Sequence, residues 1–292
     1  MPIRLRLYLL ALLPATFAAP STYGAIITLT DGNSTATLNP LSQAGMNHWD
    51  IQGQNELSQQ WFWYRVGNTG PESSIDTIGA PVVTTFNGSS GVTTTYSNAT
   101  FNISIRYLLT GGALAAPGTH ANADISETIT ITNNTASPLN FHLFQYSDFD
   151  MDGNGGDTVS LSTLGSPARY VTADQTDGVT TSLTETVVTP KANHGEAALF
   201  PFTLSRLNDG VATTLNDVAG PAGPGDAAWA LEWDFTGAGN DYAAIAPHGS
   251  VIISKDKLLD VVIQPSGAVP EPASVGVIAL GAMGLILRRR KA

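Results

Sequence analysis

The chain has 292 residues, with 13 Lys and Arg against 24 Asp and Glu and a net charge of -11. Only 13% of the residues are charged, while 29 are glycine and 17 are proline, and this composition argues against helical bundles and coiled coils. The acidic balance disfavours nucleic acid as a partner, because phosphate binding needs clustered Lys and Arg, and the absence of cysteine excludes disulfides, thiolate zinc sites and thiol nucleophiles.

The first 24 residues have the layout of a secretory signal peptide. Arg4 and Arg6 precede an apolar run over residues 7–13, and small residues surround Ala18 and Gly24. Cleavage after Ala18 and cleavage after Gly24 both fit the small-residue rule for signal peptides. We therefore expect residues 1–24 to be a signal peptide and the protein to be exported.

The body of the chain, residues 25–268, alternates between apolar and polar residues in short runs separated by turn residues. The runs that we predict to be strands are residues 25–30, 60–66, 82–86, 92–96, 100–109, 125–132, 139–146, 158–161, 168–172, 180–188, 197–204, 227–235 and 250–259. Helical periodicity does not persist through any of them. We therefore predict an all-β fold, a large antiparallel β-sandwich, in which the Gly- and Pro-rich residues 219–225 form a long surface loop.

Two of these runs are expected to form a hairpin. Residues 125–132 and 139–146 both alternate, and Asn133 to Pro138 between them are typical turn residues. The pattern predicts that the two runs pair with each other.

An acidic segment follows the second run of this pair. Its carboxylates belong to Asp148, Asp150, Asp152 and Asp157. Alternating carboxylates suit calcium, because their oxygens can converge on the ion at about 2.3–2.6 Å and Gly153 permits a sharp bend. The segment resembles the first half of an EF-hand loop, but the twelfth position holds Val159 in place of Glu, which excludes a complete EF-hand. An irregular calcium site, completed by Asp124 or Asp174, and a solvated acidic turn are the two interpretations that stay open.

A second candidate site is aromatic. Trp61 and Trp63 face the same side of a predicted strand. Exposed, they would offer a platform on which a sugar ring can stack, whereas in a strand buried on both faces they would belong to the core. Arg65 follows them and is expected to pair with Glu72 or Asp76.

Catalytic motifs are absent from the sequence. The five histidines lack zinc-site spacing, and neither a serine-hydrolase elbow nor a nucleotide-binding loop occurs. Glu127 and Glu232 could be opposed for glycoside hydrolysis, but no motif supports that role. We therefore predict that the protein is not an enzyme.

The last residues, 269–292, have three parts. Pro270, Glu271 and Pro272 come first, an apolar run covers residues 275–287, and a basic cluster ends the chain. The cluster consists of Arg288, Arg289, Arg290 and Lys291. At about 1.5 Å per residue the apolar run reaches roughly 20 Å, short of the about 30 Å of a bilayer core, so it is a marginal membrane helix. The cations are expected to stay cytoplasmic, which puts the body on the other side of the membrane.

This tail resembles the PEP-CTERM sorting signal of Gram-negative bacteria, also known as the ice-binding protein C-terminal domain, a name that implies no ice binding. The resemblance implies export, transient association with the inner membrane, and recognition by an exosortase, a membrane enzyme similar to cysteine proteases that cuts near Pro-Glu-Pro. Pro270, Glu271 and Pro272 would then be the recognition residues. Arg288, Arg289 and Arg290 would be the stop signal.

The body is similar to a group of exported PEP-CTERM proteins whose function is unassigned. The similarity rests on residues 60–65, 72–76, 144–150 and 254–257. It implies where the protein is delivered, but it does not indicate a ligand or a reaction. We predict a protein of the cell surface or of the extracellular polysaccharide matrix of a biofilm, with a non-catalytic structural or interaction role that involves calcium if the acidic segment is a site. A carbohydrate-binding module is the alternative, and a secreted glycan-active enzyme is the third hypothesis.

Overall fold

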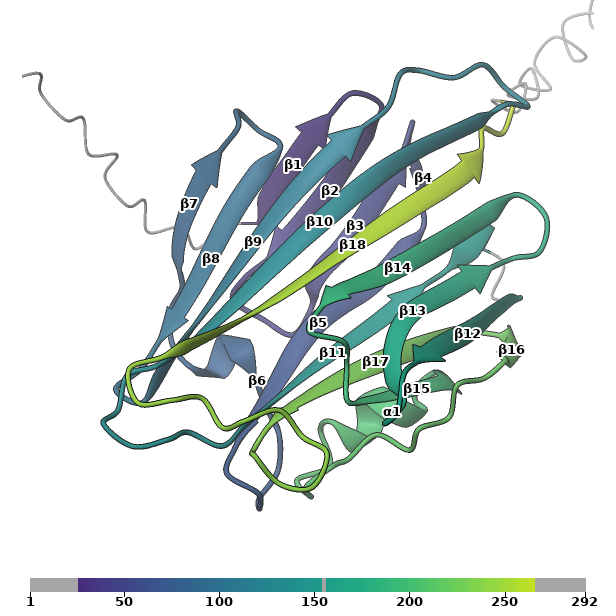
Figure 1. Ribbon diagram of the computed structural model, residues 1–292. Coiled ribbons are helices and arrows are strands. Elements are labelled where there is room, and N and C mark those ends of the chain that lie inside the picture. The colour runs from purple at the N-terminus through teal and green to yellow at the C-terminus, as the bar shows by residue number, and fades with distance from the viewer. Residues whose placement is uncertain (1–25, 154–155, 266–292) are drawn as a thin grey trace, which may run out of the picture.

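The structure is a computed structural model that describes residues 26–153 and 156–265 (Figure 1). The predicted signal peptide (1–24) and sorting segment (269–292), with its apolar run at 275–287, lie outside the described residues. Among the residues that are described, no helix is long and apolar enough to cross a membrane.

Two large β-sheets pack face to face (Figure 1). The first contains β1 (Ile27–Asp31), β2 (Ser34–Asn39), β3 (Gly45–Ile51), β4 (Gln54–Asn55), β5 (Leu57–Val66), β6 (Ser73–Ser74), β11 (Phe141–Phe149), β15 (His194–Leu199) and β17 (Ala227–Phe235). Its order is β1-β2-β3-β5-β11-β17-β15, with β4 beside β3 and β6 beside β5. These strands pair antiparallel, except that β3 and β5 run parallel.

The second sheet is antiparallel throughout its order, β16-β12-β13-β14-β18-β10-β9-β8-β7. It contains β7 (Val82–Phe86), β8 (Gly91–Ser97), β9 (Phe101–Gly111), β10 (His120–Asn133), β12 (Asp157–Leu164), β13 (Arg169–Thr176), β14 (Thr181–Thr189), β16 (Ala222–Gly225) and β18 (Ser250–Val262). Three short helices complete the described elements: η1 (Ile75–Thr77), η2 (Met151–Gly153) and α1 (Phe202–Arg206). The all-β prediction is confirmed.

Three sequence-based predictions about individual segments are wrong. The expected hairpin does not form, because β10 pairs with β9 and β18 while β11 pairs with β5 and β17 in the other sheet. Asn133 holds the crossing between the sheets by donating to the backbone oxygens of Ser137, Ile245 and Ala246. The run predicted at 197–204 ends as a strand at Leu199 and continues into α1, and part of the expected surface loop 219–225 pairs with β12 as β16.

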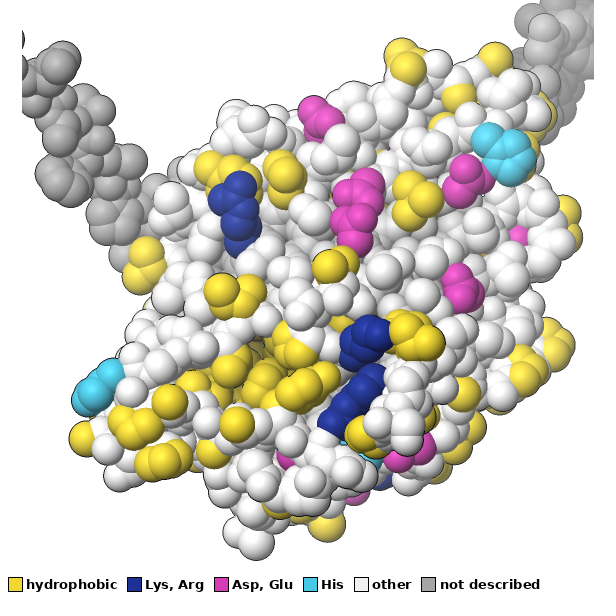
Figure 2. Space-filling model, in the orientation of Figure 1, with side chains coloured by type: hydrophobic (Ala, Val, Ile, Leu, Met, Phe, Trp, Pro, Cys, Tyr) yellow, Lys and Arg dark blue, Asp and Glu magenta, His cyan; other side chains and the backbone are white. Residues whose placement is uncertain are grey.

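The alternation of apolar and polar residues explains why the second sheet has one buried face and one outward face. In β9, β10 and β18, every second residue is buried against the first sheet, while the residues between them face outward. Figure 2 shows the outward face, where acidic side chains are scattered among polar ones and apolar side chains line a hollow in the lower part, bordered by basic side chains.

The first sheet contains strands that are buried on both faces. All nine residues of β11 and all nine of β17 are buried, so these strands show no alternation of exposure. Their inner face packs on the second sheet. On the outer face, β17 contacts α1, and Glu232 of β17 accepts a hydrogen bond from Leu215 in the chain that follows α1. The covered outer face is where the polar residues of the candidate site lie.

A buried charge network lies between the two sheets. Glu127 on β10 pairs with Lys255 and Lys257 on β18, with 2.6 Å between Lys257 Nζ and Glu127 Oε1. Glu185 on β14 lies 3.4 Å from Lys255 and 3.8 Å from Lys257. Burial alone would raise the pKa of Glu127, but the two ammonium groups lower it below its ordinary value. The four charges therefore compensate one another in the interior.

The first sheet contributes neutral donors to the same network. Gln60 on β5 donates to Glu127, and Gln145 on β11 and Trp229 on β17 donate to Glu185 at 2.7 and 3.3 Å. Because a buried carboxylate without a partner costs several kcal/mol, these contacts fix how the sheets sit on one another.

We expect Glu127→Gln to lower the free energy of unfolding by about 3–5 kcal/mol, the usual cost of removing one partner of a buried ion pair. The substitution leaves two buried lysines to share Glu185. Urea denaturation followed by tryptophan fluorescence measures the change. Thr130→Ala on the outward face of the same strand is the matched control, with an expected change below about 0.5 kcal/mol. Equal effects of the two substitutions would contradict the network.

Candidate functional site

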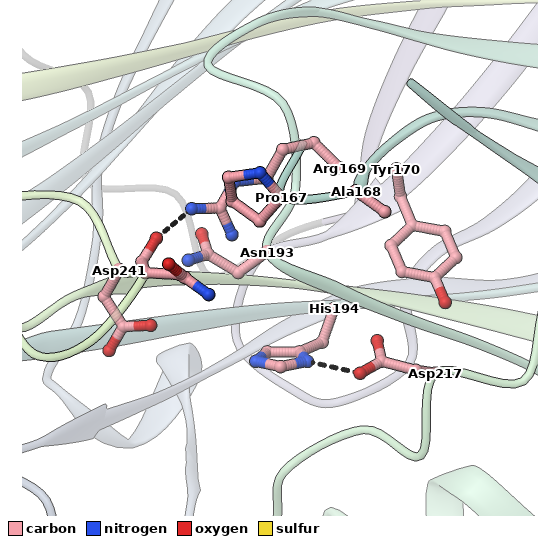
Figure 3. A pocket seen from close by; sticks show the side chains of 9 residues that line it. Pro167, Ala168, Arg169, Tyr170, Asn193, His194, Asp217 and Asp241 are labelled. Carbon is pink, nitrogen blue, oxygen red and sulfur yellow. Dashed lines mark hydrogen bonds and ion pairs between the residues drawn. The ribbon is translucent and has the colours of Figure 1, made fainter. Parts of the chain in front are cut away.

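A pocket lies between the start of β13 in the second sheet and the start of β15 in the first (Figure 3). It has a volume of about 440 Å³ and is lined by Pro167, Ala168, Arg169, Tyr170, Asn193, His194, Asp217, Asn240 and Asp241. Arg169 and Tyr170 begin β13 of the second sheet, whereas His194 begins β15 of the first. A bridge between Tyr170 and Ala192 joins the two edges behind the pocket.

Most groups around this pocket are polar and held in place. Arg169 donates to the backbone oxygen of Asn240 and lies 5.0 Å from the ring centroid of Tyr242. Figure 3 shows the side chains of His194 and Asp217 next to each other, and Nδ1 of His194 lies 2.9 Å from Asp217 Oδ2. Asp217 and Asn240 are exposed, so a ligand could reach them.

A chain of alternating imidazoles and carboxylates leads inward from the pocket. His194 Nε2 lies 3.4 Å from Asp234 Oδ2, and the other oxygen of Asp234 pairs with Nδ1 of His142. The same Nδ1 lies 3.8 Å from Glu232 Oε1. His142 is on β11 and faces Asp234 on the neighbouring β17 in the strand register. The pocket is thus connected to titratable groups that solvent does not reach.

A segment after α1 seals these groups from solvent. Within residues 213–216, three backbone amides donate to three carboxylates of the outer face: Thr213 to Glu72 at 2.9 Å, Leu215 to Glu232 at 2.8 Å and Asn216 to Glu196 at 2.9 Å. Arg65 pairs with Glu72 and donates to the backbone oxygen of Thr213 at 2.6 Å. We call residues 213–216 the cover segment.

Burial and pairing shift the pKa values of three residues in this group. Burial alone would lower the pKa of His142, but hydrogen bonds to Asp234 and Glu232 raise it to about 8. Burial raises the pKa of Glu232 to about 7, although its contact with His142 opposes this. Burial alone would raise the pKa of Asp234, yet the hydrogen bond and charge of His142 lower it. The pKa values of His142 and Glu232 thus both lie close to neutral pH.

The predicted aromatic platform is not exposed. Trp61 is 1% exposed and Trp63 is 0% exposed, and their indole N–H groups donate to Ser74 and Asn208. Both rings are therefore part of the core, because the face of β5 that carries them lies under other parts of the chain. They cannot stack on a sugar without rearrangement of the fold.

The predicted acidic ligands do not all converge. Asp148 and Asp150 come together with Asp226, whereas Asp157 accepts hydrogen bonds from the amide of Met151 and from Gln175. Asp124 and Asp174, the residues expected to complete the shell, lie on β10 and β13 of the second sheet, and neither belongs to this group. The positive φ angles of Asp152 and Gly153, 55° and 63°, agree with the expected sharp bend.

Two predictions about single residues have clear outcomes. The pairing of Arg65 with Glu72 is confirmed, and the ion pair is buried. Glu127 and Glu232 cannot act as an opposed catalytic pair, because Glu127 points between the sheets while Glu232 points to the outer face of the first sheet.

Sequence reasoning missed most of the pocket and the buried titratable groups behind it. His194 and Asp217 are 23 residues apart and carry no motif, and Asp234 was counted only as part of a strand. The available signal was the row of polar residues inside otherwise apolar strands. His142 in β11 and Glu232 with Asp234 in β17 interrupt runs that read as core.

Residues 268–291 match the PEP-CTERM protein-sorting motif. The chain therefore carries the sorting signal that its tail resembles, and this signal implies export to the cell envelope. Comparison with curated proteins found no match.

The fold is similar to those of solved structures that share little sequence with it. A putative aldose 1-epimerase from Escherichia coli K12 superposes with a TM-score of 0.52 at 11% identity, covering 82% of this chain and 99% of that one. A bacterial glucoamylase complexed with acarbose gives a TM-score of 0.52 at 11% identity. That match covers 90% of this chain and 35% of the glucoamylase, so the chain spans about a third of that enzyme. At this identity the likeness establishes the fold alone.

We expect Asp234→Asn to lower the pKa of His142 from about 8 to below its ordinary value of 6.5, because burial then dominates. In the native protein the raised pKa means that protonated His142 stabilises the fold. This contribution is complete below pH 6.5 and is lost as the pH rises through 8.

Titration of the imidazole resonances by NMR measures the pKa of His142 in both proteins. Asp217→Asn is the matched control, because Asp217 contacts His194 and should leave the pKa of His142 near 8. An unchanged pKa in Asp234→Asn would show that the carboxylate does not hold the proton on His142.

Proposed function

We propose that this is an exported, exosortase-sorted protein whose β-domain binds carbohydrate in the pocket at His194. The tail is the basis for the destination: exosortase would recognise Pro270, Glu271 and Pro272, and Arg288, Arg289 and Arg290 would hold the precursor briefly in the inner membrane. The processed body would act at the cell surface or in the extracellular polysaccharide matrix, as a non-catalytic interaction component.

The composition of the pocket is the observation that carries the carbohydrate proposal. A sugar hydroxyl both donates and accepts hydrogen bonds, so it matches neighbouring carboxylates, amides and guanidinium groups. Asp217, Asp241 and Arg169 supply such groups, and Asn193 and Asn240 add amides. The volume of about 440 Å³ lies within the usual range for small-ligand sites.

The structural neighbours support this choice of ligand. The two neighbours with a TM-score of 0.52 are a putative aldose 1-epimerase and a glucoamylase complexed with acarbose, and both names refer to sugars. A carbohydrate ligand also agrees with delivery to a polysaccharide matrix. The anionic surface of the protein disfavours acidic polymers, so we expect a neutral sugar.

Isothermal titration calorimetry of the purified protein with glucose, galactose and acarbose tests this proposal. We expect saturable binding of at least one of them, and its loss in the double variant Asp217→Ala, Asp241→Ala, because these carboxylates accept hydroxyl hydrogens. Asp260→Ala is the matched control, since Asp260 lines a different cavity. No binding of any probe by the native protein, or unchanged binding by the double variant, would refute the assignment.

A second candidate function is acid–base conversion of the bound sugar. Epimerisation at C1 of an aldose requires a base that takes the proton of the C1 hydroxyl and an acid that protonates the ring oxygen. His194 lines the pocket, and its pKa is raised because the contact with Asp217 outweighs the opposite effect of burial. His194 and Asp217 thus form an acid–base pair at the ligand pocket.

Polarimetry of freshly dissolved α-D-glucose distinguishes the two functions. If the pair is catalytic, the protein accelerates the change in rotation and His194→Gln slows it by at least about 100-fold, the lower range for general acid–base catalysis. A rate equal to that of buffer, with sugar binding intact, would leave binding as the function.

A further inference from the structure

Three carboxylates gather at one edge of the first sheet, at a site separate from the pocket. Asp148 is on β11, Asp150 directly follows that strand, and Asp226 directly precedes β17. Since Asp148 pairs in register with Ala228, the strand pairing brings Asp226 to the same edge. One oxygen from each of the three side chains lies within 4.8 Å of the other two.

The deepest member of this group has an oxygen without a hydrogen-bond donor. Asp148 is 4% exposed, and its Oδ1 is buried with no hydrogen-bond partner among the described residues. The other oxygen accepts a hydrogen bond of 3.0 Å from the hydroxyl of Tyr146, which fixes the orientation of the carboxylate. A buried carboxylate oxygen normally has a partner, because leaving it unpaired is costly.

Neutralising charge is also missing around this group. Across residues 26–153 and 156–265, none of the ion pairs involves Asp148, Asp150 or Asp226. The described part of the chain thus brings three carboxylates together without an ion-pair partner for any of them.

The neighbouring acidic residues accept hydrogen bonds from backbone amides and so fix the conformation of the loop that follows β11. Asp157 accepts the amide of Met151 at 3.0 Å, and Glu56 accepts the amide of Asp152 at 2.6 Å. The amide of Asp150 donates to the backbone oxygen of Glu56 at 2.9 Å. These contacts fix the backbone beside Asp150 before any ligand binds.

We propose that Asp148, Asp150 and Asp226 form a binding site for Ca²⁺. Calcium coordinates oxygens at about 2.3–2.6 Å and tolerates irregular geometry. Because the three oxygens lie within 4.8 Å of one another, small side-chain adjustments would let one calcium ion contact all three carboxylates. Magnesium demands a near-regular octahedron at about 2.0–2.1 Å, which an irregular group of carboxylates suits less well. Backbone oxygens and water would complete the shell. The proposal does not depend on sugar binding in the pocket.

Calorimetric titration of the purified full chain with CaCl₂, and melting curves in CaCl₂ and in chelator, test the site. We expect saturable heat and a higher melting temperature with calcium. Asp226→Asn and Asp150→Asn should each weaken binding by at least about tenfold, the lower end of the effect of losing even an outer-shell partner. Asp226 is exposed and Asp150 half-buried, so both variants should fold, and their melting curves in chelator check this.

Asp152→Asn is the matched control. Asp152 belongs to the same acidic segment but not to the group of three, so this variant should retain the calcium affinity of the native chain. Absence of heat in the native chain would overturn the proposal, as would an unchanged affinity in Asp226→Asn. Equal affinity for MgCl₂ would overturn the assignment to calcium.

Discussion

The charge network between the sheets is the interaction on which the rest of the molecule depends. Glu127, Glu185 and the two lysines of β18 join three strands of one sheet, and donors on β5, β11 and β17 join them to the other. The same three strands carry Arg65, His142 and Glu232 on their opposite face. Fixing the inner side chains therefore fixes the position of the outer ones, because neighbouring residues of a strand point to opposite faces.

The sequence was most informative where one face of a strand meets solvent. Alternation located β7 with its observed bounds and most of the second sheet to within a few residues. It failed for β2 and β3 and for the partner of β10, because pairing depends on contacts between segments far apart in the chain. The residues after Asn133 do turn the chain as predicted, but they connect a strand of one sheet to a strand of the other.

The candidate sites were less predictable than the fold, since each combines residues from distant segments. The acidic segment predicted Asp148 and Asp150, while Asp226 is brought beside them only by the pairing of β11 with β17. The pocket joins β13 to the start of β15, which no local pattern links. Trp61 and Trp63 illustrate the opposite case: their spacing fitted a platform, but burial depends on what covers the strand.

The cover segment has a consequence for how this domain can diversify. A short stretch without strand pairing of its own closes the outer face of the first sheet, through backbone amides rather than particular side chains. Insertions or deletions in it would open or reshape access to His142 and Glu232 while both sheets keep their register. Related domains can thus acquire new ligands by changing one surface loop, with the structural core under separate selection.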